Sequence, residues 1–146
     1  MRLLPRRLMQ VVREELEPVG SSGLALGKTV TDPSMAGAIL QAMSDDVSRK
    51  ILSATVSEGK PVEQISAESK IPPSTTYRRV QELTSMGLMV VERIVISESG
   101  KRYSVFRSAF RGVIAELESG QLHVEVTLNE DVADRFYRMR QAIRFG

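Results

Sequence analysis

Residues 71–87, with the sequence IPPSTTYRRVQELTSMG, predict a helix whose start, buried face and end are all encoded locally. Pro72 and Pro73 stop any helix from continuing in from upstream, because proline lacks a backbone N–H and fixes its own φ angle. Ser74 or Thr75 can then supply an N-cap oxygen to the first turn. Gly87 stands where a left-handed residue commonly ends a helix. The expected helix therefore covers residues 73–86.

The two faces of this helix differ in chemistry. Apolar or small residues recur at helical spacing on one face, which predicts a buried stripe made of Thr76, Val80, Leu83 and Met86 or Gly87. The first two turns carry polar side chains elsewhere, namely Thr75, Tyr77, Arg78 and Arg79. A helix that buries one stripe and offers hydroxyl groups and paired arginines near its N-terminus suits a DNA groove.

Composition limits the remaining possibilities. The chain has 146 residues, of which 42% are hydrophobic and 26% charged, as expected for a soluble globular domain with extensions. It has no cysteine, which excludes disulfides, thiolate zinc sites and cysteine nucleophiles. No apolar run is long enough to span a bilayer, and the basic N-terminus lacks the features of a signal peptide. A cytoplasmic location is expected.

The distribution of charge is more informative than the net charge of +2. Residues 72–107 hold six basic side chains against the three acidic ones of Glu82, Glu92 and Glu98; the six are Arg78, Arg79, Arg93, Lys101, Arg102 and Arg107. The rest of the chain is close to neutral. A local basic excess is the electrostatic footprint of a phosphate-backbone binder, although one this small also arises by chance.

Three shorter helices are expected before residue 71. The first covers Ser34 to Met43, the second begins with Ser44 as its N-cap and closes at Gly59, and the third restarts at Pro61. Together with residues 73–86 they give the succession of short helices seen in helix-turn-helix domains.

Two β-hairpins are expected after Gly87. Residues 88–96 and 103–106 form strands around a turn at 97–102, which places Lys101 and Arg102 at its tip. Such a hairpin is either a DNA-contacting wing or an ordinary solvated turn. Residues 112–118 and 121–128 form the second hairpin around the two-residue turn Ser119-Gly120.

The two ends of the chain suggest amphipathic helices. Residues 2–17 place Leu4, Leu8, Val11 or Val12, and Leu16 on one face, with four arginines elsewhere, and Pro18 ends the pattern. This segment is a packing or dimer arm, or its arginines contact DNA or another acidic surface. Residues 20–27 are expected to be a linker, and Gly27-Lys28-Thr29 lacks the spacing of a phosphate-binding loop. Asn129 can cap a final helix through Ile143, whose apolar stripe packs on its own domain or on a second chain.

Taken in order, these motifs resemble the ArsR-like winged helix-turn-helix regulators, most closely the archaeal versions. The resemblance covers residues 39 to about 110 and rests on Ser44-Asp45, Arg49 to Leu52, Ser74-Thr75, Arg78, Met86-Gly87-Leu88 and Gly100-Lys101-Arg102. It implies an α+β fold, in which a tri-helical core and a β-hairpin wing are flanked by an N-terminal helix and by a C-terminal hairpin and helix. It divides the chain into residues 1–32 (helix and linker), 33–110 (DNA-binding domain) and 111–146 (a dimerisation region).

The resemblance also implies which residues bind DNA. Groove contacts fall on Pro73, Ser74, Thr75, Tyr77 and Arg78, and wing contacts fall on Lys101 and Arg102; Arg79 is expected to be a phosphate contact or plain surface. Many relatives sense metals through cysteines, which this chain lacks. Its only histidine, His123, makes a poor metal site alone. Neither a metal nor another cofactor is expected.

The sequence therefore predicts a homodimeric regulator of transcription that binds double-stranded DNA in a sequence-specific way, with helix 73–86 in the major groove and wing 97–102 on the backbone or minor groove. The alternative is a winged-helix module of the transcription apparatus that binds protein, because a winged helix serves both purposes. An enzyme is not expected, since no nucleophile–base pair or metal centre can be recognised.

Overall fold

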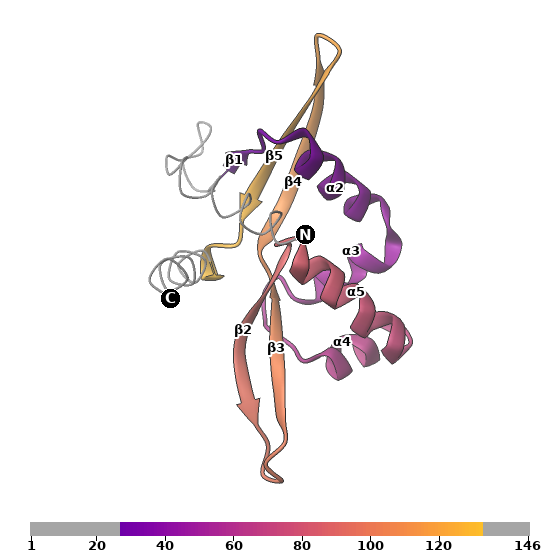
Figure 1. The fold of residues 1–146 in the computed structure, drawn as a ribbon, viewed down its shortest axis with the longest axis vertical. Coiled ribbons are helices and arrows are strands. Elements are labelled where there is room, and N and C mark those ends of the chain that lie inside the picture. The colour runs from indigo at the N-terminus through magenta and orange to yellow at the C-terminus, as the bar shows by residue number, and fades with distance from the viewer. Residues whose placement is uncertain (1–26, 133–146) are drawn as a thin grey trace.

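A computed structural model describes residues 27–132. Its elements follow one another as β1 (Gly27–Thr29), α2 (Pro33–Ser44), α3 (Asp46–Ala54), α4 (Val62–Ser69), α5 (Pro73–Ser85), β2 (Met89–Ile96), β3 (Arg102–Ser108), β4 (Phe110–Glu118) and β5 (Gln121–Leu128) (Figure 1). Helices and antiparallel strands combine in an α+β fold, as the sequence predicts. The helix expected over 2–17 lies outside the described residues, as does all but the beginning of the helix expected after Asn129.

Two hairpins extend to opposite ends of the molecule (Figure 1). Strands β2 and β3 pair from Met89 opposite Ser108 to Ile96 opposite Arg102, directly after α5. Strands β4 and β5 pair around Ser119 and Gly120, both with positive φ, as a two-residue turn requires. Both predicted hairpins are confirmed, but β3 is longer than expected and begins at Arg102, which was assigned to the turn.

Strand β1 was not predicted. It completes a three-stranded sheet of order β1-β5-β4, in which Lys28 lies opposite Val126. A strand of three residues is too short to show a period of two, and its partner β5 lies near the other end of the chain. Residue 27, expected to close a linker, instead begins a strand.

One hydrophobic core joins the helices to the three-stranded sheet. It extends from Val30 and α2 through α5 to Val124, Val126 and Leu128 on β5, and it includes Val132. The predicted buried stripe of α5 is confirmed, because Thr76, Val80 and Leu83 are all buried. This stripe packs α5 against the core of the protein.

The predicted N-caps of α3 and α5 were wrong. Ser44 is the last residue of α2, where its hydroxyl donates to the Gln41 carbonyl at 2.7 Å. The N-cap of α3 is Asp45, whose carboxylate accepts from the Ser48 N–H at 2.8 Å. An ionised carboxylate is the stronger acceptor at the positive end of a helix, which accounts for the shift by one residue.

Helix α5 has Pro72 at its N-cap position and no capping side chain, so Ser74 and Thr75 lie inside the first turn. Proline at the first helical position has no N–H to satisfy, which reduces the need for a cap.

Helix α3 also ends earlier than expected, at Ala54 rather than near Gly59. The hydroxyl of the buried Thr55 donates to the carbonyl of Ile51 at 3.0 Å, within the last turn. The chain then leaves the helix, and the backbone of Lys60 pairs with that of Phe106 through two hydrogen bonds of 2.9 Å. This pairing ties the loop after α3 to the root of the β2–β3 hairpin.

The end of α5 is as predicted. Gly87 has a φ angle of 83°, and the N–H groups of Gly87 and Leu88 donate to the carbonyls of Thr84 and Leu83 at 3.0 and 2.9 Å. These two bonds form a Schellman motif, in which the residue just after the helix, here Gly87, takes the left-handed conformation.

Replacing Gly87 with alanine is expected to lower the free energy of unfolding by about 1–2 kcal/mol, because an L-residue is strained in the left-handed region. Gly37 provides the control: it is exposed in the middle of α2, and a Cβ there would meet nothing within 4 Å. Gly37→Ala should therefore stabilise the protein by about 0.5–1 kcal/mol. Urea unfolding of both variants measures these two changes in the free energy of unfolding. Equal effects would contradict the left-handed conformation of Gly87.

Candidate nucleic-acid interface

The first two turns of α5 carry the predicted groove contacts. Pro73, Ser74, Tyr77 and Arg78 are exposed and Thr75 is half-buried. The side chain of Arg78 is 68% exposed and Tyr77 is 55% exposed. Arg78 has one weak intramolecular ion pair, with Nε 4.0 Å from Oε1 of Glu82. At that distance on the surface the pair is worth little, so the guanidinium is available to a partner.

The tip of the β2–β3 hairpin is held in a defined turn. The N–H groups of Ser97 and Gly100 donate to the carbonyls of Lys101 and Ser97, both at 2.8 Å, and the hydroxyl of Ser97 accepts from the N–H of Lys101 at 3.1 Å. Gly100 has a φ angle of 86°, which the turn requires. Both Lys101 and Arg102 are exposed. The turn thus presents two adjacent cations on a fixed backbone.

A groove of about 490 Å³ lies between the start of α5 and the hairpin. Four predicted site residues line it, Pro73, Ser74 and Tyr77 from the helix and Arg102 from the hairpin, so the structure brings the two predicted parts together. The other predicted residues, Thr75, Arg78, Arg79 and Lys101, do not line this groove. The rest of its wall consists of Val62, Glu63, Gln81, Tyr103, Ser104 and Phe106.

Tyr103 also lines this groove but was not among the predicted residues. It had been assigned only to a strand, yet it is exposed beside Arg102 in this groove. A tyrosine directly after two basic turn residues was the available signal.

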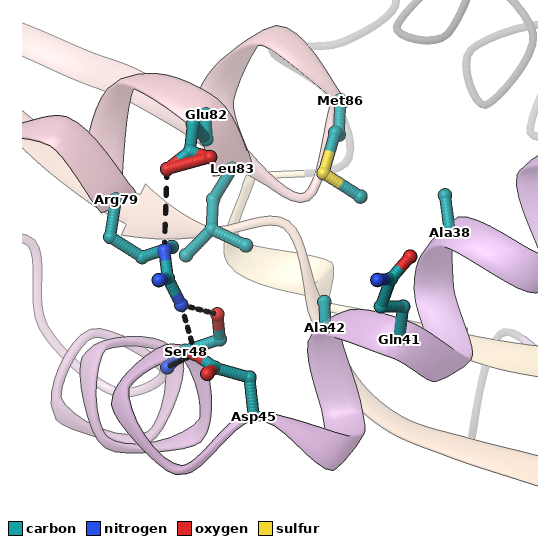
Figure 2. Close-up of a pocket in the computed structure, with 9 residues that line it drawn as sticks. All are labelled: Ala38, Gln41, Ala42, Asp45, Ser48, Arg79, Glu82, Leu83 and Met86. Atoms are coloured by element: carbon teal, nitrogen blue, oxygen red, sulfur yellow. Dashed lines mark hydrogen bonds and ion pairs between the residues drawn. The ribbon is translucent and has the colours of Figure 1, made fainter.

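Arg79 has a different environment from its neighbour Arg78. Its guanidinium points to the beginning of α3, where it forms a close ion pair with Asp45 and donates to the hydroxyl of Ser48 at 2.9 Å (Figure 2). It also donates to Glu82 at 3.3 Å, and only 22% of its side chain is exposed. Arg79 therefore joins α5 to α3, and its charge is largely engaged inside the protein.

Asp45 is the acceptor at the centre of this junction. The pKa of its carboxyl is lowered, first by the hydrogen bonds from the backbone and side chain of Ser48 and then by the Arg79 guanidinium. A lowered pKa in the folded state means that the contact stabilises the protein above the ordinary pKa of an aspartate. That stability is lost as the pH falls through the lowered folded-state pKa.

Replacing Asp45 with alanine is expected to destabilise the protein by about 1–2 kcal/mol, because it removes the N-cap of α3 and the partner of Arg79. The control is Asp46→Ala, since Asp46 is exposed and pairs with Arg49 and Lys50 on the surface. That change should stay within about 0.5 kcal/mol. Urea unfolding at pH 7 and again near pH 3 should show the difference between the variants shrinking at the lower pH.

Arg107 was counted in the basic excess but lies inside the protein. Its side chain is 7% exposed, and it donates to the carbonyl of Val56 at 3.0 Å, to Glu92 at 2.8 Å and to Asp131 at 2.6 Å. Glu92 sits at the β-bulge of strand β2. Arg107 thus ties the root of the hairpin to the loop after α3 and to the chain beyond β5. The exposed cations of this region are Arg78, Arg93, Lys101 and Arg102.

Within residues 27–132, no group of three or more histidine, cysteine, aspartate or glutamate side chains is placed to hold a metal ion. None of the helices that the structure describes is both long and apolar enough to cross a membrane.

No protein-family model matches the chain, and no curated protein matches it. Among solved structures, the chain is similar to the homodimeric winged helix-turn-helix DNA-binding domain of a possible ArsR-family transcriptional regulator from Mycobacterium bovis. The two share 18% sequence identity over 76% of this chain and 80% of that one, with a TM-score of 0.37. A TM-score this low does not establish a common fold.

Proposed function

We propose that this chain is a regulator of transcription that binds double-stranded DNA in a sequence-specific way. Helix α5 lies in the major groove and the turn at 97–102 contacts the backbone or the minor groove. The observation that carries the proposal is the shared surface of the two parts: the uncapped, exposed start of α5 and the basic hairpin border one groove. A helix N-terminus flanked by fixed cations suits a phosphate backbone, and exposed Arg and Tyr side chains suit base edges.

Each side chain has a separate role in this proposal. Arg78 and Tyr77 reach base edges or flanking phosphates, while Pro73, Ser74 and Thr75 set the start of the helix on a phosphate. Lys101 and Arg102 contact the backbone or the minor groove. Arg79 orients α5 from within, through Asp45 and Ser48.

The proposal extends to the class and assembly of the protein. An ArsR-like winged helix-turn-helix regulator of archaeal type, without a metal sensor, would act in the cytoplasm as a homodimer. In that arrangement residues 33–110 bind DNA and residues 111–146 make the dimer, with 1–32 as an N-terminal helix and linker. The motif order from Ser44 to Arg102 supports this class.

The salt dependence of duplex binding tests the function. Affinity for fragments selected from random double-stranded DNA should fall steeply between 50 and 200 mM salt, because each phosphate contact releases counterions. Fluorescence anisotropy with labelled duplexes measures the slope. Absence of duplex binding at low salt would sink the proposal.

Lys101→Ala is expected to weaken binding to all duplexes by a similar factor and to reduce the salt slope by about one, as the loss of a phosphate contact does. Arg111→Ala is the matched control, since Arg111 is an exposed cation on β4, outside the proposed interface. It removes the same charge and should leave both quantities nearly unchanged. Equal losses in the two variants would show a general charge effect instead of a contact.

One observation favours a second function, a winged-helix module that binds protein. Ile94 and Ile96 are more than half exposed on β2, and Tyr103 is exposed on β3. Exposed apolar side chains on one hairpin are typical of a protein-binding surface. If the chain bound no duplex at low salt and Ile94→Ser abolished capture of a transcription factor that binds no DNA, this second function would replace the first.

A further inference from the structure

A second groove lies on the side of α5 that carries Arg79. It has a volume of about 410 Å³ and is enclosed by helices α2, α3 and α5 (Figure 2). Its lining residues are Ala38, Gln41, Ala42, Asp45, Ser48, Arg79, Glu82, Leu83 and Met86. The proposed DNA-binding residues Tyr77, Arg78 and Lys101 take no part in it.

The groove has an apolar floor and an acidic rim. Two alanines of α2 face Leu83 and Met86 of α5, and small residues on one wall leave room for apolar side chains from outside. Among the nine lining residues, Asp45 and Glu82 are negative and Arg79 alone is positive. The side chains of Asp45 and Glu82 are 39% and 55% exposed, so both can take further cationic partners. An amphipathic helix with a leucine stripe and flanking arginines would match both features.

The chain itself contains such a segment. Residues 2–17 carry an apolar stripe that includes Leu4, Leu8 and Leu16, and the same residues include Arg2, Arg6, Arg7 and Arg13. We propose that this groove between α2, α3 and α5 docks residues 2–17 of the same chain, with the stripe on the floor and arginines beside Asp45 and Glu82.

The connection is long enough. Residues 18–26 separate this segment from β1, and nine extended residues span about 30 Å. Strand β1 is followed almost at once by α2, which forms one wall of the groove. Docking within one chain also has the advantage of a high effective concentration. An arm that rests on the partly exposed Ala38 and Met86 would fix the C-terminal half of α5 from the side away from the hairpin.

The absence of cysteine allows a direct test in the chain of 146 residues. The double variant Leu8→Cys with Ala38→Cys should form a disulfide within one chain under mild oxidation, seen as a shifted monomer band on a non-reducing gel. Two matched pairs serve as controls: Arg6→Cys with Ala38→Cys moves the thiol to the opposite face of the predicted helix, and Leu8→Cys with Ser53→Cys moves it to an exposed site on α3 outside the groove. The first pair should give a several-fold higher yield than either control.

Charge is tested at Gln41, an exposed lining residue whose side chain can be changed without removing an ion pair. In the double variant Leu8→Cys with Ala38→Cys, the further change Gln41→Glu should raise the yield of the disulfide. Gln41→Arg should lower that yield. If Ala38→Cys does not fold, Gln41→Cys replaces it in the first pair. Equal yields in all pairs would overturn the proposal, and so would a disulfide found only between two chains, which would assign the groove to a second copy.

Discussion

Replacing Arg78 with alanine is expected to lower the affinity for a preferred duplex by about 5- to 150-fold, the equivalent of 1–3 kcal/mol for a base-reading arginine. The reason is geometric. The guanidinium is mostly exposed at the start of α5, and among residues 27–132 its ion-pair partner is Glu82, at the long distance of 4.0 Å. Its loss should also relax the base preference at one position of the DNA site while leaving other positions unchanged. Competition binding with duplexes that differ at single base pairs measures both effects.

The adjacent residue Arg79 is the control for this prediction. Arg79→Ala removes the same charge from the same helix, but it breaks the junction with Asp45 and Ser48. We therefore expect it to lower the free energy of unfolding while the fraction that remains folded keeps its base preference. Arg78→Ala should do the reverse, with unchanged stability in urea. If the two variants behaved alike in both measurements, Arg78 would not be the residue that reads the bases.

Arg78 and Arg79 show which features of this site could be predicted from the sequence and which could not. Residues within α5 itself determine its exposed start, its buried stripe and its end at Gly87. The spacing of these residues was therefore enough to predict all three features. Which arginine faces outward depends on Asp45, which lies 34 residues earlier in the chain. A periodic pattern contains no information about such a partner.

The same reason explains the other differences. Both hairpins were predicted because their turns and alternating strands are local signals. Strand β1 and the internal position of Arg107 were not predicted, because both depend on distant partners. Strand β1 pairs with β5, and Arg107 donates to a carbonyl 51 residues away. Arg107 therefore looked like one more cation in a basic segment, although its charge is enclosed at the root of the hairpin.

Arg107 carries the second prediction with a large effect. Arg107→Met keeps much of the apolar stem but removes the guanidinium that joins Glu92, Asp131 and the carbonyl of Val56. Glu92 is mostly buried and would retain only the exposed Arg93, at 3.0 Å, as an ion-pair partner. Breaking a buried pair by removing one partner costs about 3 kcal/mol or more, so we expect a loss of about 3 kcal/mol in the free energy of unfolding.

The control for Arg107 is Arg93→Met, which removes the exposed partner of the same glutamate and should cost no more than about 0.5 kcal/mol. Combining Arg107→Met with Glu92→Gln should recover part of the loss, because the uncompensated carboxylate is then absent. Because Arg107 fixes the root of the hairpin, amide hydrogen exchange in β2 and β3 should be faster in Arg107→Met than in Arg93→Met. The affinity of Arg107→Met for duplex DNA, measured at low temperature, should also be lower. Equal stability and exchange in the two single variants would show that the hairpin is held by its packing against α4 and α5 instead.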